Sequence, residues 1–241
     1  MHTTAPAHVL SSTNIQTNSL NYVVLQKYQA AVTAFQEEVS YLRETNDHQS
    51  LFNAMKRLAL AQIECGLHTA ALSTYKQLLA EQEMKKASEE DKLETTLAIV
   101  NAHIHAGDIE TALAYLDELI SAAKASDNKV KQVYYLMQAG DIHMNKKNNA
   151  DAASTLLKEA AAIAKSIPLS QKTLKLKYDA HAMLSHAFEK LNDFSNAISA
   201  MNVALECAID INSTDDQKHS ITRLRRLAAL RDKAEDEKLG L

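Results

Sequence analysis

Ten histidines and two cysteines are the side chains in this sequence best suited to bind a metal ion. His103 and His105 are two residues apart on a predicted helix, so their rings point about 200° apart and do not chelate one ion. Cys65 and His68 flank a predicted turn and could supply two zinc ligands. A structural zinc site needs four ligands, and the sequence shows no second pair of ligands to complete this one. We therefore expect no metal and no other cofactor.

Nucleophilic and nucleotide chemistry lack their usual motifs. With only 4 glycines in 241 residues, the sequence has no Gly-x-Ser-x-Gly elbow, no phosphate-binding loop and no dinucleotide fingerprint. Carboxylates such as Glu118, Glu159 and Glu206 fall on predicted helix surfaces without a paired partner, which is typical of solvated faces. The sequence therefore predicts a protein that is not an enzyme, with no catalytic or cofactor-binding residue.

The charge balance argues against polyanionic partners. The chain has 26 basic and 30 acidic residues, a net charge of −4, which gives no excess of positive charge to bind phosphate backbones or anionic lipid. Arg223, Arg225 and Arg226 form a local basic patch, but acidic residues follow within three helical turns and cancel its field. We expect neither a nucleic acid nor a membrane surface as a partner.

The cysteines and the apolar residues indicate the compartment. Cys65 and Cys207 each lie in an apolar helical pattern, as reduced, buried thiols do. No window approaches the roughly 18 apolar residues of a membrane span, and residues 1–20 lack the charged region of a signal peptide. A cytoplasmic location is the resulting expectation.

The composition also predicts which elements carry these side chains. Only 4 glycines and 2 prolines are present, too few for the turns of a sheet protein, and no tryptophan occurs. Apolar residues recur at helical spacing almost throughout. An all-α fold follows, and helices are predicted over 19–45, 48–65, 68–86, 89–106, 109–126, 128–146, 149–166, 170–191, 194–212 and 215–238.

Four segments of the sequence repeat one pattern: an apolar helix, a tight turn at Gly or Asn, and a second helix with a small residue near its start. The small residues are Ala71, Ala112, Ala153 and Ala197, at spacings of 41, 41 and 44 residues. Two antiparallel helices joined by a short turn approach closely, and alanine lets their backbones touch. The turns need a left-handed residue, for which the candidates are Gly66, Gly107, Asn148 and Asn192.

This pattern resembles the tetratricopeptide repeat (TPR), in which a Gly-Asp-Tyr-like turn precedes an alanine and then an aromatic or large apolar residue. Residues 107–112 (Gly-Asp-Ile-Glu-Thr-Ala) and 192–197 (Asn-Asp-Phe-Ser-Asn-Ala) match it well, and Tyr75 follows Ala71 by four positions. The period departs from the common value of about 34 residues, the early tryptophan is missing, and residues 146–149 carry one extra position. Repeats with such long helices resemble those of kinesin light chains and of several bacterial regulatory proteins.

The resemblance implies a right-handed α-solenoid of antiparallel helix pairs with a capping helix at each end. We expect a disordered leader at 1–18, an N-terminal capping helix at 19–47, four pairs at 48–212 and a C-terminal capping helix at 213–241. Ser88, Asp127, Ser170 and Thr214 are the predicted helix caps.

In the family, the first helix of each pair lines a concave groove that binds other proteins. The family's groove positions correspond here to Asn53, Lys56, Arg57, Asn101, His105, Tyr134, Met137, Gln138, Asp141 and His186. Such a mixture of polar, aromatic and charged side chains suits an extended peptide or a helix. The resemblance therefore implies a non-enzymatic adaptor that binds a protein or peptide partner.

Three alternatives remain open from the sequence. One is a structural subunit of a larger assembly, a second is a peptide-sensing regulatory module, and a third is a homodimer formed through Leu224, Leu227 and Leu230. The carboxylate clamp of chaperone-tail-binding TPR domains is disfavoured. Lys56 occupies its first position, but Leu60 and Ala98 replace two of its asparagines.

Overall fold

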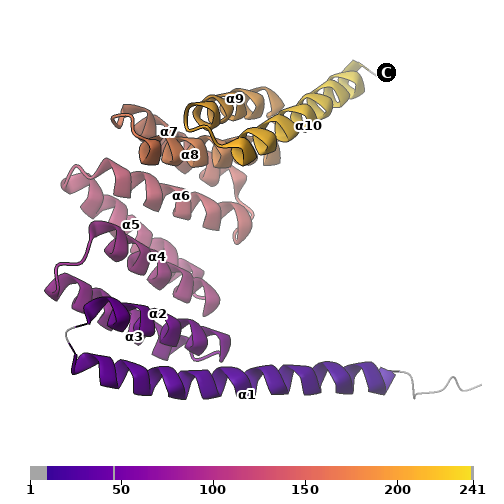
Figure 1. Cartoon of the computed structure of the whole chain (residues 1–241). Coiled ribbons are helices and arrows are strands. Elements are labelled where there is room, and N and C mark those ends of the chain that lie inside the picture. Colours follow the sequence, from indigo (N-terminus) through magenta and orange to yellow (C-terminus); the bar gives the residue numbers. More distant parts are fainter. Residues whose placement is uncertain (1–9, 46, 240–241) are drawn as a thin grey trace, which may run out of the picture. The chain divides into compact units, whose positions relative to one another are not determined.

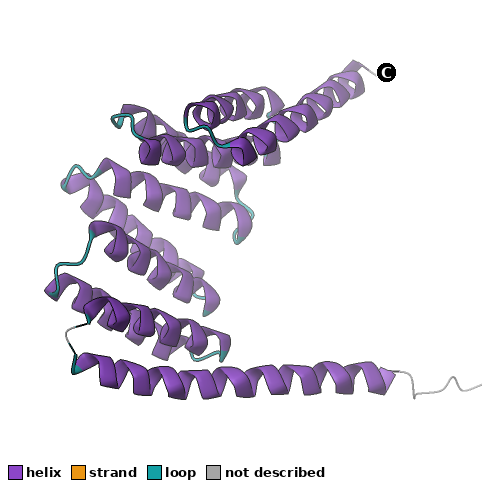
Figure 2. Cartoon of the chain, viewed as in Figure 1, coloured by secondary structure: helices purple, strands orange, loops and turns teal. Residues whose placement is uncertain are grey.

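The chain folds into helices joined by short turns. The computed structural model describes residues 10–45 and 47–239, and within them it contains no strand (Figures 1 and 2). The helices are α1 (Leu10–Arg43), α2 (His48–Glu64), α3 (His68–Met84), α4 (Glu89–His105), α5 (Ile109–Ala125), α6 (Lys129–Asn145), α7 (Ala150–Ser166), α8 (Gln171–Lys190), α9 (Phe194–Asp210) and α10 (Thr214–Leu239). The predicted all-α fold is confirmed, and apart from the start of α1 every bound lies within two residues of its prediction.

The helices form two compact units, which are described separately. Unit 1 runs Met1–Asp108 and contains α1 to α4, and unit 2 runs Ile109–Leu241 and contains α5 to α10. Within each unit a helix packs on the helices before and after it, and in unit 2 α6 also touches α8. The described helices include none with the length and apolarity that a bilayer crossing requires.

Residues in the left-handed conformation end most of the helices. Gly66 and Gly107 have φ of 72° and 78°, and Asn148 and Asn192 have φ of 49° and 57°, as the repeat pattern predicts. The amide of Gly66 donates to the Ile63 carbonyl at 2.8 Å, which satisfies a carbonyl at the end of α2. Three further residues with side chains take the same conformation: Lys86, Asp127 and Asn212.

Two of the four predicted caps are correct. The Ser88 hydroxyl accepts from the Asp91 amide at 3.1 Å, and Ser170 forms a capping box with Thr173. The predicted cap at Asp127 is wrong because this residue closes α5 in the left-handed conformation, and Asn128 caps α6 instead. The cap at Thr214 is also wrong, since Ser213 accepts from the Asp216 amide at 3.4 Å.

The small residues of the repeat lie where helices of one unit meet. Ala71, in unit 1, and Ala112, Ala153 and Ala197, in unit 2, are each 0% exposed, as predicted. Gly140, inside α6, allows a still closer approach between two helices than alanine does. A Cβ atom on Gly140 would stand 2.8 Å from Cγ of Leu157 on α7, so only glycine allows this approach.

The terminal helices are longer than their neighbours. α1 begins at Leu10 instead of residue 19 and has 34 residues, so it continues past the end of α2 (Figure 1). Part of the leader predicted at 1–18 is therefore helical, and residues 1–9 lie outside the described residues. A helix grows readily from an existing turn, which explains why polar residues join α1 despite their low propensity. In unit 2, α10 covers α9 with Leu227, which is fully buried.

Candidate binding site

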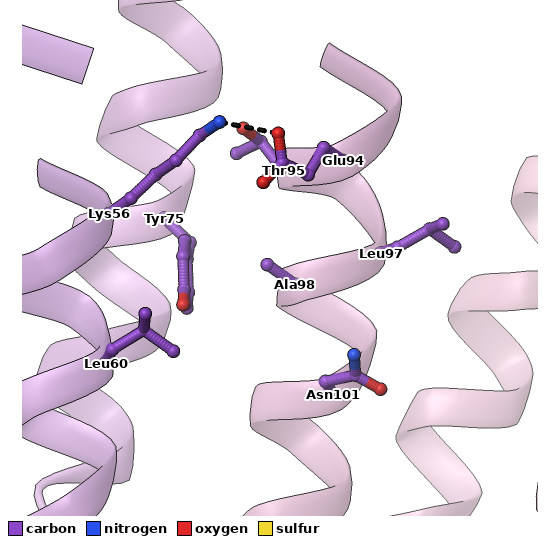
Figure 3. A pocket seen from close by; sticks show the side chains of 8 residues that line it. All are labelled: Lys56, Leu60, Tyr75, Glu94, Thr95, Leu97, Ala98 and Asn101. Atoms are coloured by element: carbon purple, nitrogen blue, oxygen red, sulfur yellow. Dashed lines mark hydrogen bonds and ion pairs between the residues drawn. The ribbon is translucent and has the colours of Figure 1, made fainter. Parts of the chain in front are cut away.

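Unit 1 contains a pocket between α2, α3 and α4. Its volume is about 310 Å³, and its lining consists of Lys56, Leu60, Tyr75, Glu94, Thr95, Leu97, Ala98 and Asn101. Figure 3 shows side chains from α2 and α4 facing one another, with Tyr75 of α3 between them. The pocket therefore lies between the first helices of two consecutive pairs, where the resemblance places a groove.

An ion pair closes one end of this pocket. The Lys56 ammonium lies 2.6 Å from a carboxylate oxygen of Glu94, so it spans from α2 to α4 (Figure 3). Beside it, the Thr95 hydroxyl donates to the Asp91 carbonyl at 3.0 Å, which leaves the Thr95 methyl group on the pocket wall. Since the charge of Lys56 is already matched, the pocket presents no unpaired cation to a ligand.

Tyr75 forms the back of the pocket. The residue is only 3% exposed, and burial, followed by the charge of Glu94, raises the pKa of its hydroxyl, which therefore stays protonated at neutral pH. Within the described residues, that hydroxyl makes no hydrogen bond. Figure 3 shows the ring standing between the two facing helices, with its hydroxyl end toward Leu60 and Ala98.

The apolar wall of the pocket was not among the predicted site residues. Leu60 is 55% exposed although it is aliphatic, and Ala98 opposes it from α4. In the sequence, Leu60 and Ala98 served only as evidence that the chain lacks a carboxylate clamp. The available signal was that Leu60 lies off the buried face of α2, which Met55 and Leu58 define, so an aliphatic residue there must face solvent or a ligand.

Five predicted groove residues lie in unit 1, and two of them line the pocket, Lys56 and Asn101. Asn53 and His105 are exposed outside it. Arg57 binds Glu38 of α1 at 2.6 Å and stacks 5.0 Å from the centre of the Phe35 ring.

The other five lie in unit 2, four of them on α6 and His186 on α8. Tyr134 and Gln138 are half-buried on α6, and Asp141 accepts from the Asn145 amide at 2.7 Å. Met137 is 7% exposed and belongs to the core, so little of it is available to a ligand. Contacts of α6 with both α7 and α8 account for this burial. His186 is half-buried, and burial, then the charge of Arg223, lowers its pKa.

Ionic contacts tie α10 to α8 in unit 2. Glu189 is bound by Arg223 at 2.9 Å and by Arg226, and Lys175 lies 3.0 Å from Asp216. Two arginines of the predicted basic patch therefore have a carboxylate partner inside the chain.

Leucines of α10 also pack against other helices of unit 2. Leu227 is fully buried, and Leu224 packs against the core of unit 2. Leu227 is therefore not available to a second copy of the chain, whereas Leu224 and Leu230 are half-buried.

No cluster of three metal-ligating side chains occurs in the part of the chain that the structure describes. Cys65 and Cys207 are free thiols, but only Cys207 is buried. Burial raises the pKa of both thiols, so neither is an activated nucleophile. Glu118, Glu159 and Glu206 are exposed, as predicted.

Solved structures share this fold, although a scan against models of known protein families and a search of curated proteins find no match. One is a putative kinesin light chain from Podosopora anserina with nearly identical TPR-like repeats, at 16% identity and a TM-score of 0.52, covering 81% of this chain and 95% of that chain. The chain has a TPR-like fold. BtubC from P. vanneervenii shows higher structural similarity, with a TM-score of 0.63 at 14% identity over 86% of this chain and 87% of that chain.

A third similar structure is NprR in complex with its cognate peptide NprX. It matches at 15% identity with a TM-score of 0.50, over 89% of this chain and 59% of that chain. The resemblance predicted from the repeats is thus confirmed at the level of the TPR-like fold.

Proposed function

We propose that this TPR-like chain is a non-enzymatic interaction module that binds a peptide or helical segment of a partner protein. The observation that carries the proposal is the pocket between α2 and α4, with Leu60 exposed at its edge. An apolar side chain of a partner gains most from burial here, because the wall is apolar and the one cation is paired.

Polar groups around the pocket suit the rest of such a segment. The amide of Asn101 has both donors and an acceptor, so it matches the N–H and C=O groups of an extended backbone. A TPR-like neighbour, NprR, is described in complex with a peptide, which supports a peptide as the ligand class. The free thiols of Cys65 and Cys207 support a reducing, cytoplasmic compartment.

A protein partner other than a second copy of this chain is favoured. Of the leucines that would join two copies through α10, Leu227 is fully buried in unit 2 and Leu224 packs partly against its core. Two of the three arginines that would contact a polyanion are held by Glu189.

A random peptide library displayed on phage, selected against the full chain, tests the proposal. Enriched peptides are then titrated against the wild type, Leu60→Lys and the matched control Met84→Lys, which places the same charge on another exposed apolar residue of unit 1. We expect binding to fall at least tenfold with Leu60→Lys and to stay unchanged with Met84→Lys. Equal affinities for all three proteins, or a selection without enrichment, contradict the proposal.

A further inference from the structure

We propose that the pocket between α2 and α4 selects an aromatic side chain that carries a hydrogen-bond donor, namely tryptophan or tyrosine, in the partner segment. This inference rests on the proposed function and specifies the ligand of the same site. It follows from the size of the pocket, the character of its walls and one hydroxyl group.

The size of the pocket suits a ring. A cavity of about 150 Å³ is known to accept benzene, and this pocket measures about 310 Å³. An indole or phenol ring therefore fits with room to adjust. A small aliphatic side chain would leave part of the volume unfilled and lose the contacts of the unfilled wall.

The walls favour an aromatic occupant. Leu60 and Ala98 face each other across the pocket, and the small side chain of Ala98 leaves the width that a flat ring needs (Figure 3). The Tyr75 ring behind them offers an edge or a face to a second ring, an arrangement that adds to the gain from apolar burial.

The charge of the pocket argues against an ionised occupant. Lys56 and Glu94 neutralise each other at 2.6 Å, so neither a carboxylate nor an ammonium group finds an unpaired counter-charge. A charged side chain would lose its hydration without compensation.

The Tyr75 hydroxyl provides the selectivity. Its residue is 3% exposed and the hydroxyl has no hydrogen-bond partner within the described residues. A bound side chain shields this group from water, and an unpaired buried hydroxyl weakens binding. An indole N–H or a phenol O–H can donate to the Tyr75 oxygen, whereas phenylalanine and leucine cannot.

Two small probes separate shape from hydrogen bonding. Indole has the N–H donor, and 1-methylindole has the same ring system without it. Each is titrated into the full ¹⁵N-labelled chain, with the amide signals of Tyr75, Ala98 and Asn101 as the readout. We expect both probes to shift these signals and indole to bind about tenfold more tightly.

Two variants complete the test. Tyr75→Phe removes the hydroxyl alone, and we expect it to reduce indole affinity to that of 1-methylindole while leaving 1-methylindole affinity unchanged. Ala98→Met fills the pocket and should abolish binding of both probes. An unchanged spectrum away from the pocket shows that each variant is folded.

The outcomes distinguish this inference from the proposed function. Equal binding of both probes to the wild type, or an indole affinity that Tyr75→Phe leaves unchanged, overturns the selection of a donor. Absence of probe binding at the pocket overturns the aromatic occupant. The peptide selection stands apart, because enriched peptides that lose affinity with Leu60→Lys but contain no shared tryptophan or tyrosine would support the proposed function and refute the inference.

Discussion

Replacing Gly140 by alanine offers a sharp test of the packing in unit 2, because two effects of opposite sign compete there. Gly140 lies inside α6, where alanine is favoured over glycine by about 1 kcal/mol of helix propensity. Against this, the new Cβ would lie 2.8 Å from Cγ, 3.0 Å from Cδ2 and 3.3 Å from Cδ1 of Leu157. The sign of the change depends on whether Leu157 can move.

The structure indicates that Leu157 cannot move cheaply. Its side chain is 0% exposed, and the closest atom is the branch point, which is not a flexible end. Overpacking a core costs about 1–3 kcal/mol, and we place this case near the upper limit. After subtracting the propensity gain, Gly140→Ala should lower the free energy of unfolding of unit 2 by about 1–2 kcal/mol.

Urea unfolding followed by far-ultraviolet circular dichroism measures this change, with Leu157→Ala as the matched background. Leu157→Ala alone should cost about 3 kcal/mol through the cavity that it creates. In that background the clash is gone, so Gly140→Ala should instead stabilise by about 1 kcal/mol. A stabilising effect in the wild type, or a destabilising effect in both backgrounds, refutes the assignment of this contact as the reason for glycine.

Three further predictions concern other features. Burial lowers the pKa of His181 from 6.5 to about 4, with two nearby lysines adding to the shift. As the pH falls, the His181 imidazole of the unfolded chain is therefore protonated before that of the folded chain, which favours unfolding. The contribution of His181 to the free energy of unfolding should be complete above about pH 6.5 and should fall by about 1–2 kcal/mol toward pH 4. Urea titrations across this range should show that His181→Leu abolishes this loss. Lys86 and Gly66 share the left-handed conformation at φ of 55° and 72°. Lys86→Gly should therefore raise the free energy of unfolding and Gly66→Ala should lower it, each by about 1 kcal/mol, which urea unfolding measures. Glu189→Gln removes the negative charge that pairs with Arg223. It should lower the free energy of unfolding by about 2 kcal/mol in urea titrations, and by less at high salt.

The fold was predictable from the sequence because its signals are local. Helix periodicity, the small residues at the helix contacts and the turn residues Gly66 and Gly107 together predict the helix bounds to within two residues, apart from the start of α1. The caps at Asp127 and Thr214 were misassigned because several residues with capping side chains stand next to one another there. Only the backbone conformation decides which of them closes one helix and which begins the next.

The candidate site was predictable only in part. Lys56 and Asn101 follow from the family's groove positions, but the pocket also depends on Leu60, Tyr75 and Ala98, none of which the groove positions include. Met137 follows from the groove positions too, but its position on α6 does not reveal how closely α7 and α8 pack around it. Such distinctions depend on three helices at once, and one helical pattern does not contain them.

The contacts within each unit join helices that are neighbours along the chain, with α6 and α8 as one pair separated by a single helix. Topologies of this kind close only short loops during folding, and they fold fast for their size. Within unit 1, α2 and α3 pack against each other, α2 packs on α1 and α3 packs on α4, and all four helices lie before residue 108. We therefore expect the pocket to be assembled on the ribosome before unit 2 has been synthesised. The proposed binding site would then be complete while translation is still under way.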